Sequence, residues 1–446
     1  MPIPMTLIDI APKLEPGKSP FEDVSIYSPP GPEGDATKLS SPRSYTLSLS
    51  PQLIYSRSSL LPVLISSKVF RQLEFQAVGG WWIQKPGTGS ASEGDDANSA
   101  STTLYRVPGS REDVFADKLI SVKSKRTLMR FLRHISRDQQ DSEESEEEDL
   151  SMPLPDYLSS KLQVPDELHD PLLSLSLSQN SPKQTPANYA VSRIKQHLAS
   201  IGVFGPGFGS LIAKWGGGSE IASDSPESDD GRTRIQLSNG DTVTTKFTVG
   251  SYWDLPSQPV TSQARCHKVA RSISVVSSPL ESLFEITAEG APTPAGAVVV
   301  FPGKSLGQGD DSRPVYLLIH SCDTGECPLG QSVIYGSTGL PGPQGQGLIE
   351  SAVNELLKVV ANPTAKVLWS LRYTQLGRDD DIVNATQAVE PNTRNIISFP
   401  PPSLDLAVDD ATIDLVRAAW KAIMGEEAVD DEFMDFEDRE GAYDDD

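Results

Sequence analysis

The chain has 446 residues and a formal net charge of −23, with 37% hydrophobic residues, 22% charged residues and three cysteines. This length predicts two or three domains with sizeable cores, and three cysteines exclude a framework of disulfides. The acidic balance argues against nucleic-acid binding, because clustered carboxylates repel phosphate groups.

Two segments carry most of the negative charge. Residues 138–149 hold eight acids without Lys or Arg, and residues 425–446 hold twelve acids against Arg439. Runs of like charge are typical of solvated, disordered tails, which we predict for both segments. The more specific alternative for residues 138–149 is a phosphorylation site for an acidophilic kinase, at Ser142 and Ser145.

Neither membrane insertion nor secretion is predicted. The longest apolar stretches fall short of the ~20 residues that span a bilayer. Residues 1–18 are proline-rich and lack the apolar region of a signal peptide. We therefore predict a cytoplasmic protein.

The stretch from about 60 to 201 is predicted to be mainly helical with long loops. Before it, alternating residues predict a strand over 44–48. Apolar residues at helical spacing predict helices over 60–75 and, after a capping-box pattern, over 110–135. A serine-rich linker at 172–185 leads to a further helix that ends at Ser200.

The helix predicted to end near residue 135 has one apolar and one basic face. Seven positive charges lie along it and its flanks, just before the first acidic run. We interpret the basic face as solvated and partly neutralised by those acids. An acidic partner or membrane head groups are the alternatives.

Residues 203–222, VFGPGFGSLIAKWGGGSEIA, hold six glycines in twenty positions. Gly205, Gly207 and Gly209 overlap a phosphate-binding fingerprint, which requires a strand before the glycines and a helix after them. A helix with Val191, Ile194, His197 and Leu198 on one face precedes the glycines instead. We therefore favour a glycine-rich turn from helix to strand, packed on a core, over a nucleotide loop.

After residue 231 the hydrophobic period changes from 3.6 to 2. Asn239-Gly240 predicts a hairpin over 234–249. Further strands are predicted at 272–276, 297–301, 315–320 and 367–373, and helices at 348–360 and 411–424, the last with Ile413, Val416, Trp420 and Ile423 inward.

No catalytic or metal-binding motif is recognisable in the chain. The five histidines lie in helical, acidic or strand-end contexts without a partner nucleophile, and the chain lacks hydrolase, P-loop and zinc-protease motifs. Cys322 and Cys327 have a C-x4-C spacing beside His320, but no zinc ligand set is completed. We predict no catalytic residue, no metal and no cofactor, which favours a binding protein.

The glycine-rich residues 203–222 resemble the family of Rab GDP-dissociation inhibitors and Rab escort proteins, the latter being component A of Rab geranylgeranyl transferase. The sequence of this segment most resembles that of fungal escort proteins. Similar stretches occur in order along most of the chain, at 43–78, 107–132, 242–256, 366–375 and 436–441.

The resemblance implies an α/β fold, an FAD-monooxygenase-like (GDI-like) mixed-sheet domain with an inserted α-helical domain. The expected domains are the first part of the α/β domain at 1–58, the helical insertion with its acidic and serine-rich disordered loops at 59–202, the remainder at 203–425 and a disordered acidic tail at 426–446.

The resemblance also implies an accessory protein rather than an enzyme. Its expected partners are GDP-loaded Rab GTPases, the Rab geranylgeranyl transferase heterodimer and the geranylgeranyl lipid, with transient delivery of the product to a membrane. A soluble carrier of such a lipid needs an apolar pocket, since each buried CH₂ contributes about 0.8 kcal/mol. In the family this pocket lies in the helical domain, here about residues 60–200.

A Rab-binding platform of the family includes a G-x-E-[LI] motif, which Gly218-Ser-Glu220-Ile221 matches, with Trp215 just before it. Glu220 is the best candidate for contacting the GTPase; without the resemblance, an acid at a helix start fits it as well. Seven residues beyond, Glu227 stands where the family has an arginine.

The N-terminal strand and G-x-G-type turn of the family are not found between Met1 and Phe21. We expect an incomplete gene model or a spliced form, and weak Rab binding if the chain is used as written. A recycling GDP-dissociation inhibitor is the alternative function, disfavoured by the acidic and serine-rich insertions. An FAD-dependent oxidoreductase is the alternative of another class, disfavoured because the first nucleotide turn is missing.

Overall fold

The computed structural model describes thirteen segments of the chain. They are residues 19–29, 39–85, 103–109, 111–135, 150–205, 208–214, 227–229, 232–236, 240–253, 266–286, 290–360, 364–378 and 395–436. All structural statements below concern these segments.

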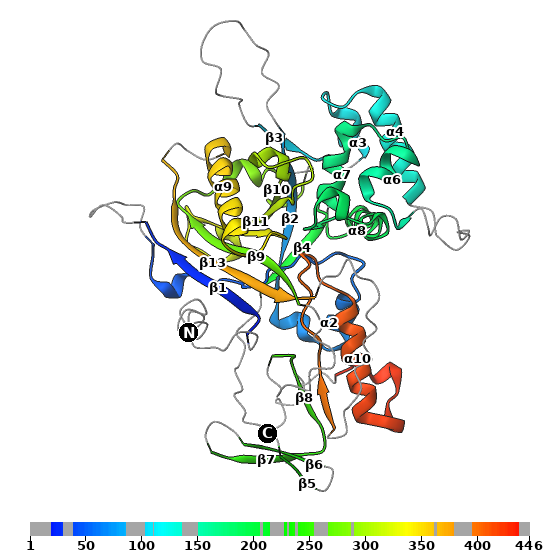
Figure 1. Ribbon diagram of the computed structural model, residues 1–446, viewed down its shortest axis with the longest axis vertical. Coiled ribbons are helices and arrows are strands. Elements are labelled where there is room, and N and C mark those ends of the chain that lie inside the picture. Colours follow the sequence, from blue (N-terminus) through cyan, green and yellow to red (C-terminus); the bar gives the residue numbers. More distant parts are fainter. Residues whose placement is uncertain are drawn as a thin grey trace, which may run out of the picture.

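A mixed sheet of nine strands forms the centre of the molecule (Figure 1). Its order is β1-β13-β9-β12-β11-β10-β2-β3, and β4 also pairs with β2. Only β10 and β2 run parallel; the other pairs are antiparallel. The strands are β1 (Phe21–Tyr27), β2 (Glu74–Lys85), β3 (Thr103–Arg106), β4 (Ser210–Lys214), β9 (His267–Val276), β10 (Gly296–Phe301), β11 (Val315–Ser321), β12 (Ser332–Thr338) and β13 (Val367–Gly377).

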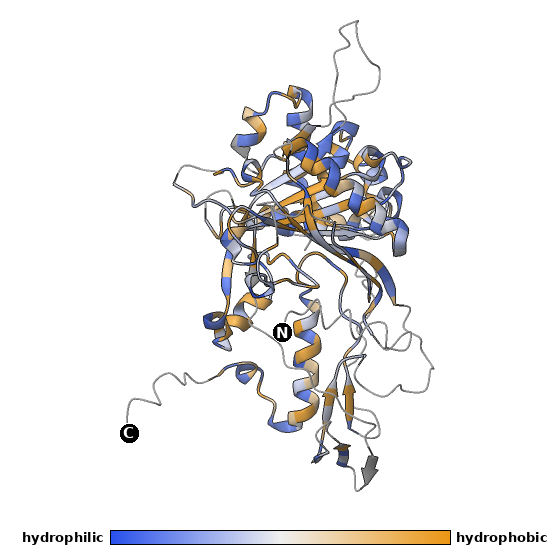
Figure 2. Cartoon of the chain, turned by 90° about the vertical axis from the view of Figure 1, so that its left-hand side faces the viewer, coloured by the Kyte–Doolittle hydropathy of each residue, from blue (hydrophilic) through white to orange (hydrophobic). Residues whose placement is uncertain are grey.

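The central strands are apolar on both faces, and every residue of β10 and β11 is buried. Ala297, Val299 and Phe301 join one core, whereas Val298 and Val300 join the other. Such continuous apolar runs are expected where both faces of a sheet are covered. Figure 2 shows these hydrophobic strands in the upper part of the molecule.

Different helices pack on the two faces of the sheet. The helix α9 (Gly342–Val360) packs its apolar side on β9, β11 and β12. The opposite core contains side chains of a helical cluster, which lies to the right in Figure 1. Its helices are α3 (Arg111–Ala116), α4 (Val122–Ile135), α6 (Leu154–Ser160), α7 (His169–Leu175) and α8 (Ala187–Ser200).

The remaining elements lie below the large sheet in Figure 1. They are α2 (Leu60–Ser66), α10 (Ala411–Met424), the parallel pair β8 (Thr248–Gly250) and β14 (Ile396–Ser398), and a small sheet of β5 (Glu227–Asp229), β6 (Arg232–Gln236) and β7 (Thr242–Thr245). Their core is small: Ile397 and Ala419 are its buried residues among the described ones, with a few half-buried neighbours.

The elements predicted in the second half of the chain are confirmed. The four predicted strands are β9, β10, β11 and β13, and the two helices are α9 and α10. The hairpin is β6–β7, but its second strand ends at Thr245 rather than at 249, and Val249 belongs to β8 instead. Its register pairs Gln236 with Thr242. A two-residue turn at Asn239-Gly240 would require a register shifted by one residue, so the connection between β6 and β7 is longer than predicted. Ile423 was predicted to face inward but is 39% exposed.

The helical prediction for 60–201 is wrong at its beginning. The helix over 60–75 ends at Ser66, and Lys68 adopts a left-handed φ of 59° before β2 starts at Glu74. Because β2 and β3 belong to the large sheet, we propose that the helical insertion covers residues 111–200 rather than 59–202. Residues 44–48 form no strand; a 3₁₀ turn at Pro42–Ser44 precedes them.

Two segments predicted to be disordered are folded. In the serine-rich stretch 172–185, the side chains of Ser174, Ser178 and Thr185 are buried because hydroxyls and backbone carbonyls accept their hydrogen bonds. Residues 426–436 of the acidic tail contain two 3₁₀ turns, and the ring of Phe433 lies against Trp420. The first acidic run, 138–149, and residues 437–446 lie outside the described residues.

Gly345→Ala is expected to destabilise the protein by several kcal/mol, because a Cβ at this position would overlap the carbonyl oxygen of Leu340 and lie 2.8 Å from Cβ of Ala270. Gly347→Ala is the matched control on the same helix. A Cβ there meets no atom within 4 Å, so this change should stabilise α9 by about 0.5–1 kcal/mol. Denaturant unfolding of both variants measures the difference, and equal stabilities would contradict the packing of α9.

Candidate functional site

The four predicted Rab-contacting residues, Trp215, Gly218, Glu220 and Ile221, lie outside the described residues. The structure does describe the strand that precedes them in the sequence, β4. Strand β4 pairs antiparallel with β2 as far as Lys214, opposite Glu74. On its other side Leu211 bridges to Ile54 through two backbone hydrogen bonds, 2.8 and 2.9 Å long.

The glycine-rich turn connects α8 to β4. Gly202 has a φ of 80° and donates its amide to the carbonyl of Phe208 at 2.9 Å. Gly205 has a φ of 135°, a conformation that is strained for any residue with a side chain. The ring of Phe208 is buried beneath the turn. This arrangement confirms the predicted turn from helix to strand and differs from the strand-to-helix order of a nucleotide loop.

His197 on α8 lies against this turn. Its ring packs edge-on against Tyr55 and Trp81, with centroids 5.8 and 4.7 Å away. A Cβ on Gly209 would lie 3.1 Å from its Cε1, so only glycine fits there without displacing the ring. Complete burial lowers the pKa of His197 to about 4, which keeps the ring neutral near pH 7.

A buried ion pair fastens α8 to the C-terminal part of the chain. The guanidinium of Arg193 pairs with the carboxylate of Asp405, which also accepts a hydrogen bond from Tyr189 at 3.1 Å. The backbone amide of Ala407 donates to the same carboxylate at 3.1 Å. Because both charges are mostly buried, loss of either partner would leave an uncompensated charge. Nothing in the sequence pattern pointed to Asp405.

An apolar cavity of about 290 Å³ lies in the helical cluster. It opens between β3, the α3–α4 connection, α7 and the end of α8. Its lining is mostly aliphatic, with two charged side chains: Lys85, Tyr105, Val107, Pro108, Gly109, Val114, Leu119, Ile120, Leu128, Leu132, Glu167, Leu168, Pro171, Leu172, Leu175, Leu198 and Ile201. The cavity lies in the part of the chain where the resemblance implied an apolar pocket.

Exposed apolar side chains lie at the connection of α3 to α4, and one of them, Leu119, also lines this cavity. Phe115 is 55% exposed, Leu119 75% and Val122 66%, all at the connection of α3 to α4. The next residues along α4 include the exposed cations Lys123 and Arg126. A grouped set of exposed apolar side chains of this kind marks an interaction surface. We call Phe115, Leu119, Val122, Lys123 and Arg126 the α3–α4 surface.

Residues 25–220 match the family model described as GDP dissociation inhibitor. Over this range the chain is similar to the GDP dissociation inhibitor family. The matched residues include β2, β3, the helical cluster and β4, and the last of them is Glu220 of the predicted platform motif.

Relatives of the GDP dissociation inhibitor domain include two fungal proteins named Rab proteins geranylgeranyltransferase component A. The one from Candida albicans is 26% identical over 71% of this chain, and the one from Saccharomyces cerevisiae is 25% identical over 78%. The chain spans about half the length of these two relatives, 49% and 55%. Guanosine nucleotide diphosphate dissociation inhibitor 1 of Arabidopsis thaliana is 22% identical over 69% of the chain and 67% of its own length.

The crystal structure of a Rab GDI from Plasmodium falciparum has the same fold. Its TM-score is 0.57 at 15% identity, over 87% of this chain and 85% of that one. The mixed sheet with a helical insertion is therefore confirmed as a GDI-like fold. Among the described residues, no helix combines the length and apolar character needed to cross a membrane.

Stability should fall as the pH is lowered from about 6.5 towards 4, because His197 is held neutral when folded and gains a proton more readily when unfolded. Because the pKa of His197 is lowered on folding, its contribution to the free energy of unfolding is complete above pH 6.5. This contribution falls by about 3 kcal/mol in all as the pH drops through this window. Denaturant unfolding at several pH values measures the slope.

His197→Phe replaces the ring without a titrating group and should flatten this slope. Leu329→Gln, at a side chain that is 91% exposed, is the control and should leave the slope as in the wild type. A wild-type slope in the His197→Phe variant would contradict the assignment.

Proposed function

We propose that this protein is a Rab escort protein. It binds GDP-loaded Rab GTPases, presents them to Rab geranylgeranyl transferase and carries the prenylated product to membranes. The observation that carries the proposal is the apolar cavity of the helical cluster, inside a GDP dissociation inhibitor family domain whose fungal relatives are named as geranylgeranyltransferase components. The protein itself performs no bond-forming step.

The cavity would hold the geranylgeranyl chain. Its walls are mostly aliphatic side chains from four elements. Two of its polar groups have partners: Lys85 lies 3.7 Å from the centroid of the Tyr105 ring, and the Tyr105 hydroxyl donates to Asp117. Transfer of each CH₂ of a lipid into such a site contributes about 0.8 kcal/mol. The cavity volume lies at the small end of ligand pockets, so side chains at its mouth would move to admit a C20 lipid.

The α3–α4 surface would dock the transferase. Leu119 belongs both to this surface and to the cavity lining, so a protein bound there lies next to the lipid site. An enzyme that adds a lipid must release it close to the carrier's pocket. Exposed Phe115 supplies an aromatic anchor of the kind that dominates protein interfaces, and Lys123 and Arg126 add charge for orientation.

Glu220, with Gly218, Ile221 and Trp215, would contact the GTPase. These residues follow β4, whose pairing to both β2 and Ile54 gives the segment a fixed starting point.

Mixing the purified chain with a GDP-loaded Rab and the transferase heterodimer, followed by gel filtration, tests the escort function. A ternary complex supports it; extraction of prenylated Rab from membranes without any transferase binding would favour a recycling GDP-dissociation inhibitor instead.

Binding of a dansyl-labelled geranylgeranyl lipid should weaken at least tenfold in Leu132→Asp, because the new carboxylate would lie in the wall of the cavity without a partner. Leu329→Asp is the control, since Leu329 is 91% exposed on the turn before β12. Fluorescence titration measures both. Unchanged affinity in Leu132→Asp would place the lipid elsewhere.

A GDP-loaded Rab should bind with a Kd weaker than about 1 µM, because Glu227 replaces an arginine that the family platform has. Glu220→Ala should lower this affinity further, roughly three- to tenfold, as expected for loss of one hydrogen bond to a charged group. Glu281→Ala, on an exposed turn of the sheet domain, is the control. Isothermal titration measures the affinities, and submicromolar binding by the wild type would contradict the first expectation.

A further inference from the structure

The helix α4 carries a row of exposed cations on its outer side. Lys123, Arg126, Arg130 and Arg133 are all exposed, and they follow one another at intervals of three or four residues. At about 100° of rotation per residue, this spacing keeps them on one side of the helix. The side that faces the core holds the buried residues Ser124, Thr127, Leu128, Phe131 and Ile135. We call Lys123, Arg126, Arg130 and Arg133 the α4 basic face.

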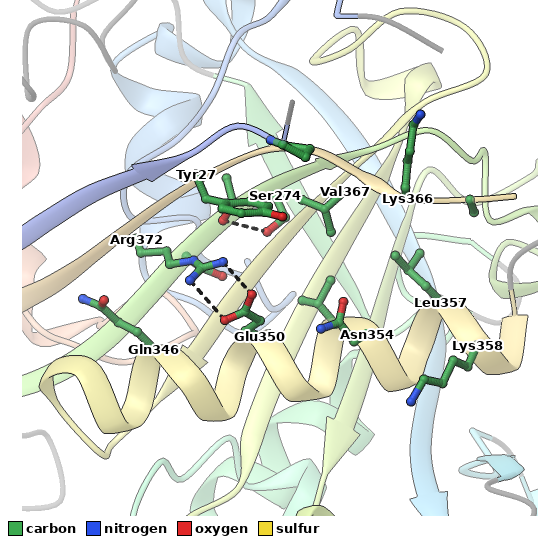
Figure 3. A pocket seen from close by; sticks show the side chains of 15 residues that line it. Tyr27, Ser274, Gln346, Glu350, Asn354, Leu357, Lys358, Lys366, Val367 and Arg372 are labelled. Atoms are coloured by element: carbon green, nitrogen blue, oxygen red, sulfur yellow. Dashed lines mark hydrogen bonds and ion pairs between the residues drawn. The ribbon is translucent and has the colours of Figure 1, made fainter. Parts of the chain in front are cut away.

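The α4 basic face presents positive charge that the described residues do not neutralise. None of its four side chains forms an ion pair within the segments that the structure describes. Beside α9, by contrast, Arg372 forms a bidentate pair with Glu350 at 2.9 and 3.1 Å (Figure 3). Lys358 of α9 likewise lies 2.6 Å from Glu355. The unpaired cations of α4 therefore favour an anionic partner, although the chain has a formal net charge of −23.

Exposed apolar side chains adjoin the α4 basic face. Val122 is 66% exposed and precedes Arg126 by four residues, so the two side chains lie on the same side of α4. Leu119 is 75% exposed and Phe115 is 55% exposed, both at the α3–α4 connection. At a membrane, apolar side chains of this kind enter the boundary between head groups and acyl chains, whereas lysine and arginine bind anionic head groups. The combination is typical of a protein surface that lies on a membrane.

The apolar cavity is next to this surface. Leu119 lines the cavity although its side chain is largely exposed, and Leu128 and Leu132 of α4 line it as well. The helices α3 and α4 lie at the outer end of the helical cluster, away from α10 and the small sheet (Figure 1). A bilayer that contacts Leu119 would therefore lie next to the cavity, and a lipid would pass between the two with little exposure to water.

We propose that the α4 basic face, with Val122 and Leu119, binds a membrane whose surface contains anionic phospholipids such as phosphatidylserine. The four cations would contact the head groups, and the two apolar side chains would enter the boundary with the acyl chains. The biological role rests on the proposed escort function, because a lipid carrier must release its product at a membrane. Lys123 and Arg126 also belong to the α3–α4 surface, so the transferase must leave before the membrane binds there.

Co-sedimentation of the full chain with vesicles tests this surface. Vesicles of phosphatidylserine and phosphatidylcholine in equal parts should bind the protein saturably, and vesicles of phosphatidylcholine alone should not. Raising the salt from about 0.1 M to about 1 M should release the protein, because the Debye length falls from about 10 Å to about 3 Å. The full chain includes the eight acids of residues 138–149, which follow α4 in the sequence, so the measured affinity includes their effect.

The double variant Arg130→Glu/Arg133→Glu should bind the anionic vesicles at least tenfold more weakly, since each cation near such a surface contributes about fivefold. Arg57→Glu/Lys246→Glu is the matched control, because it changes the net charge equally at two exposed cations outside the helical cluster. The control should bind the anionic vesicles as tightly as the wild type. Both variants should unfold near the wild-type temperature.

Val122→Ser tests the apolar contribution independently of charge. This variant should bind the anionic vesicles roughly threefold more weakly, because less apolar surface is transferred out of water. Its salt dependence should equal that of the wild type. Val243→Ser, at a 44% exposed side chain of β7, is the control and should bind as the wild type does.

Equal binding of both vesicle types, or unchanged binding by Arg130→Glu/Arg133→Glu, would overturn the proposal. Tighter binding of polyglutamate than of the anionic vesicles would also overturn it, because the α4 basic face would then fit an acidic protein instead.

Gel filtration with the transferase and a GDP-loaded Rab separates this proposal from the escort function. Arg130 and Arg133 lie outside the α3–α4 surface, so the double variant should still assemble with both partners. Loss of this assembly together with vesicle binding would overturn the assignment of the two arginines to the membrane. The vesicle assay contains neither partner, so a wild type that binds vesicles but not the transferase would contradict the escort function alone.

Discussion

The double burial of the central strands is the constraint on which the rest of the structure depends. A strand such as β10, apolar at every position, must be covered on both faces, and each buried aliphatic side chain contributes about 1.5–3 kcal/mol. One face takes α9, and the other takes the helical cluster. The close approach of α9 at Gly345 and Gly336 follows from this requirement, because side chains there would hold the helix away from the sheet.

The same constraint positions strand β4, which precedes the predicted GTPase-binding residues in the sequence. The helical cluster can cover its face only if α8 is held in position, and the Arg193–Asp405 pair and the packing of His197 do this. The chain then returns to the sheet through the glycine turn and pairs as β4 with β2. Strand β4 ends at Lys214, which pairs with Glu74 at the start of β2.

The two cavities differ in chemistry because they lie beside different helices, on opposite faces of the sheet. The apolar cavity lies within a cluster of short helices whose aliphatic faces do not fill all of the space between them. A second cavity, of about 710 Å³, lies beside α9, where this single helix leaves part of β9 and β13 uncovered and Ser272, Ser274 and Ser370 replace aliphatic residues.

The sequence by itself determined the fold class, the buried strands β10 and β11 and the two long helices α9 and α10, because an apolar pattern extends over enough residues to be unambiguous there. It also located the glycine turn and the family resemblance. It did not predict β12, although every residue of that strand is buried. It missed β2, whose Gly79-Gly80-Trp81-Trp82 centre has no strand-like alternation, and it misread the serines at 172–185 as a solvated linker. Only the tertiary structure decided these, since a serine is buried or exposed according to whether a carbonyl or hydroxyl lies within reach. The Arg193–Asp405 pair and the burial of His197 against Trp81 likewise depend on contacts between residues far apart in the chain, which no local pattern encodes.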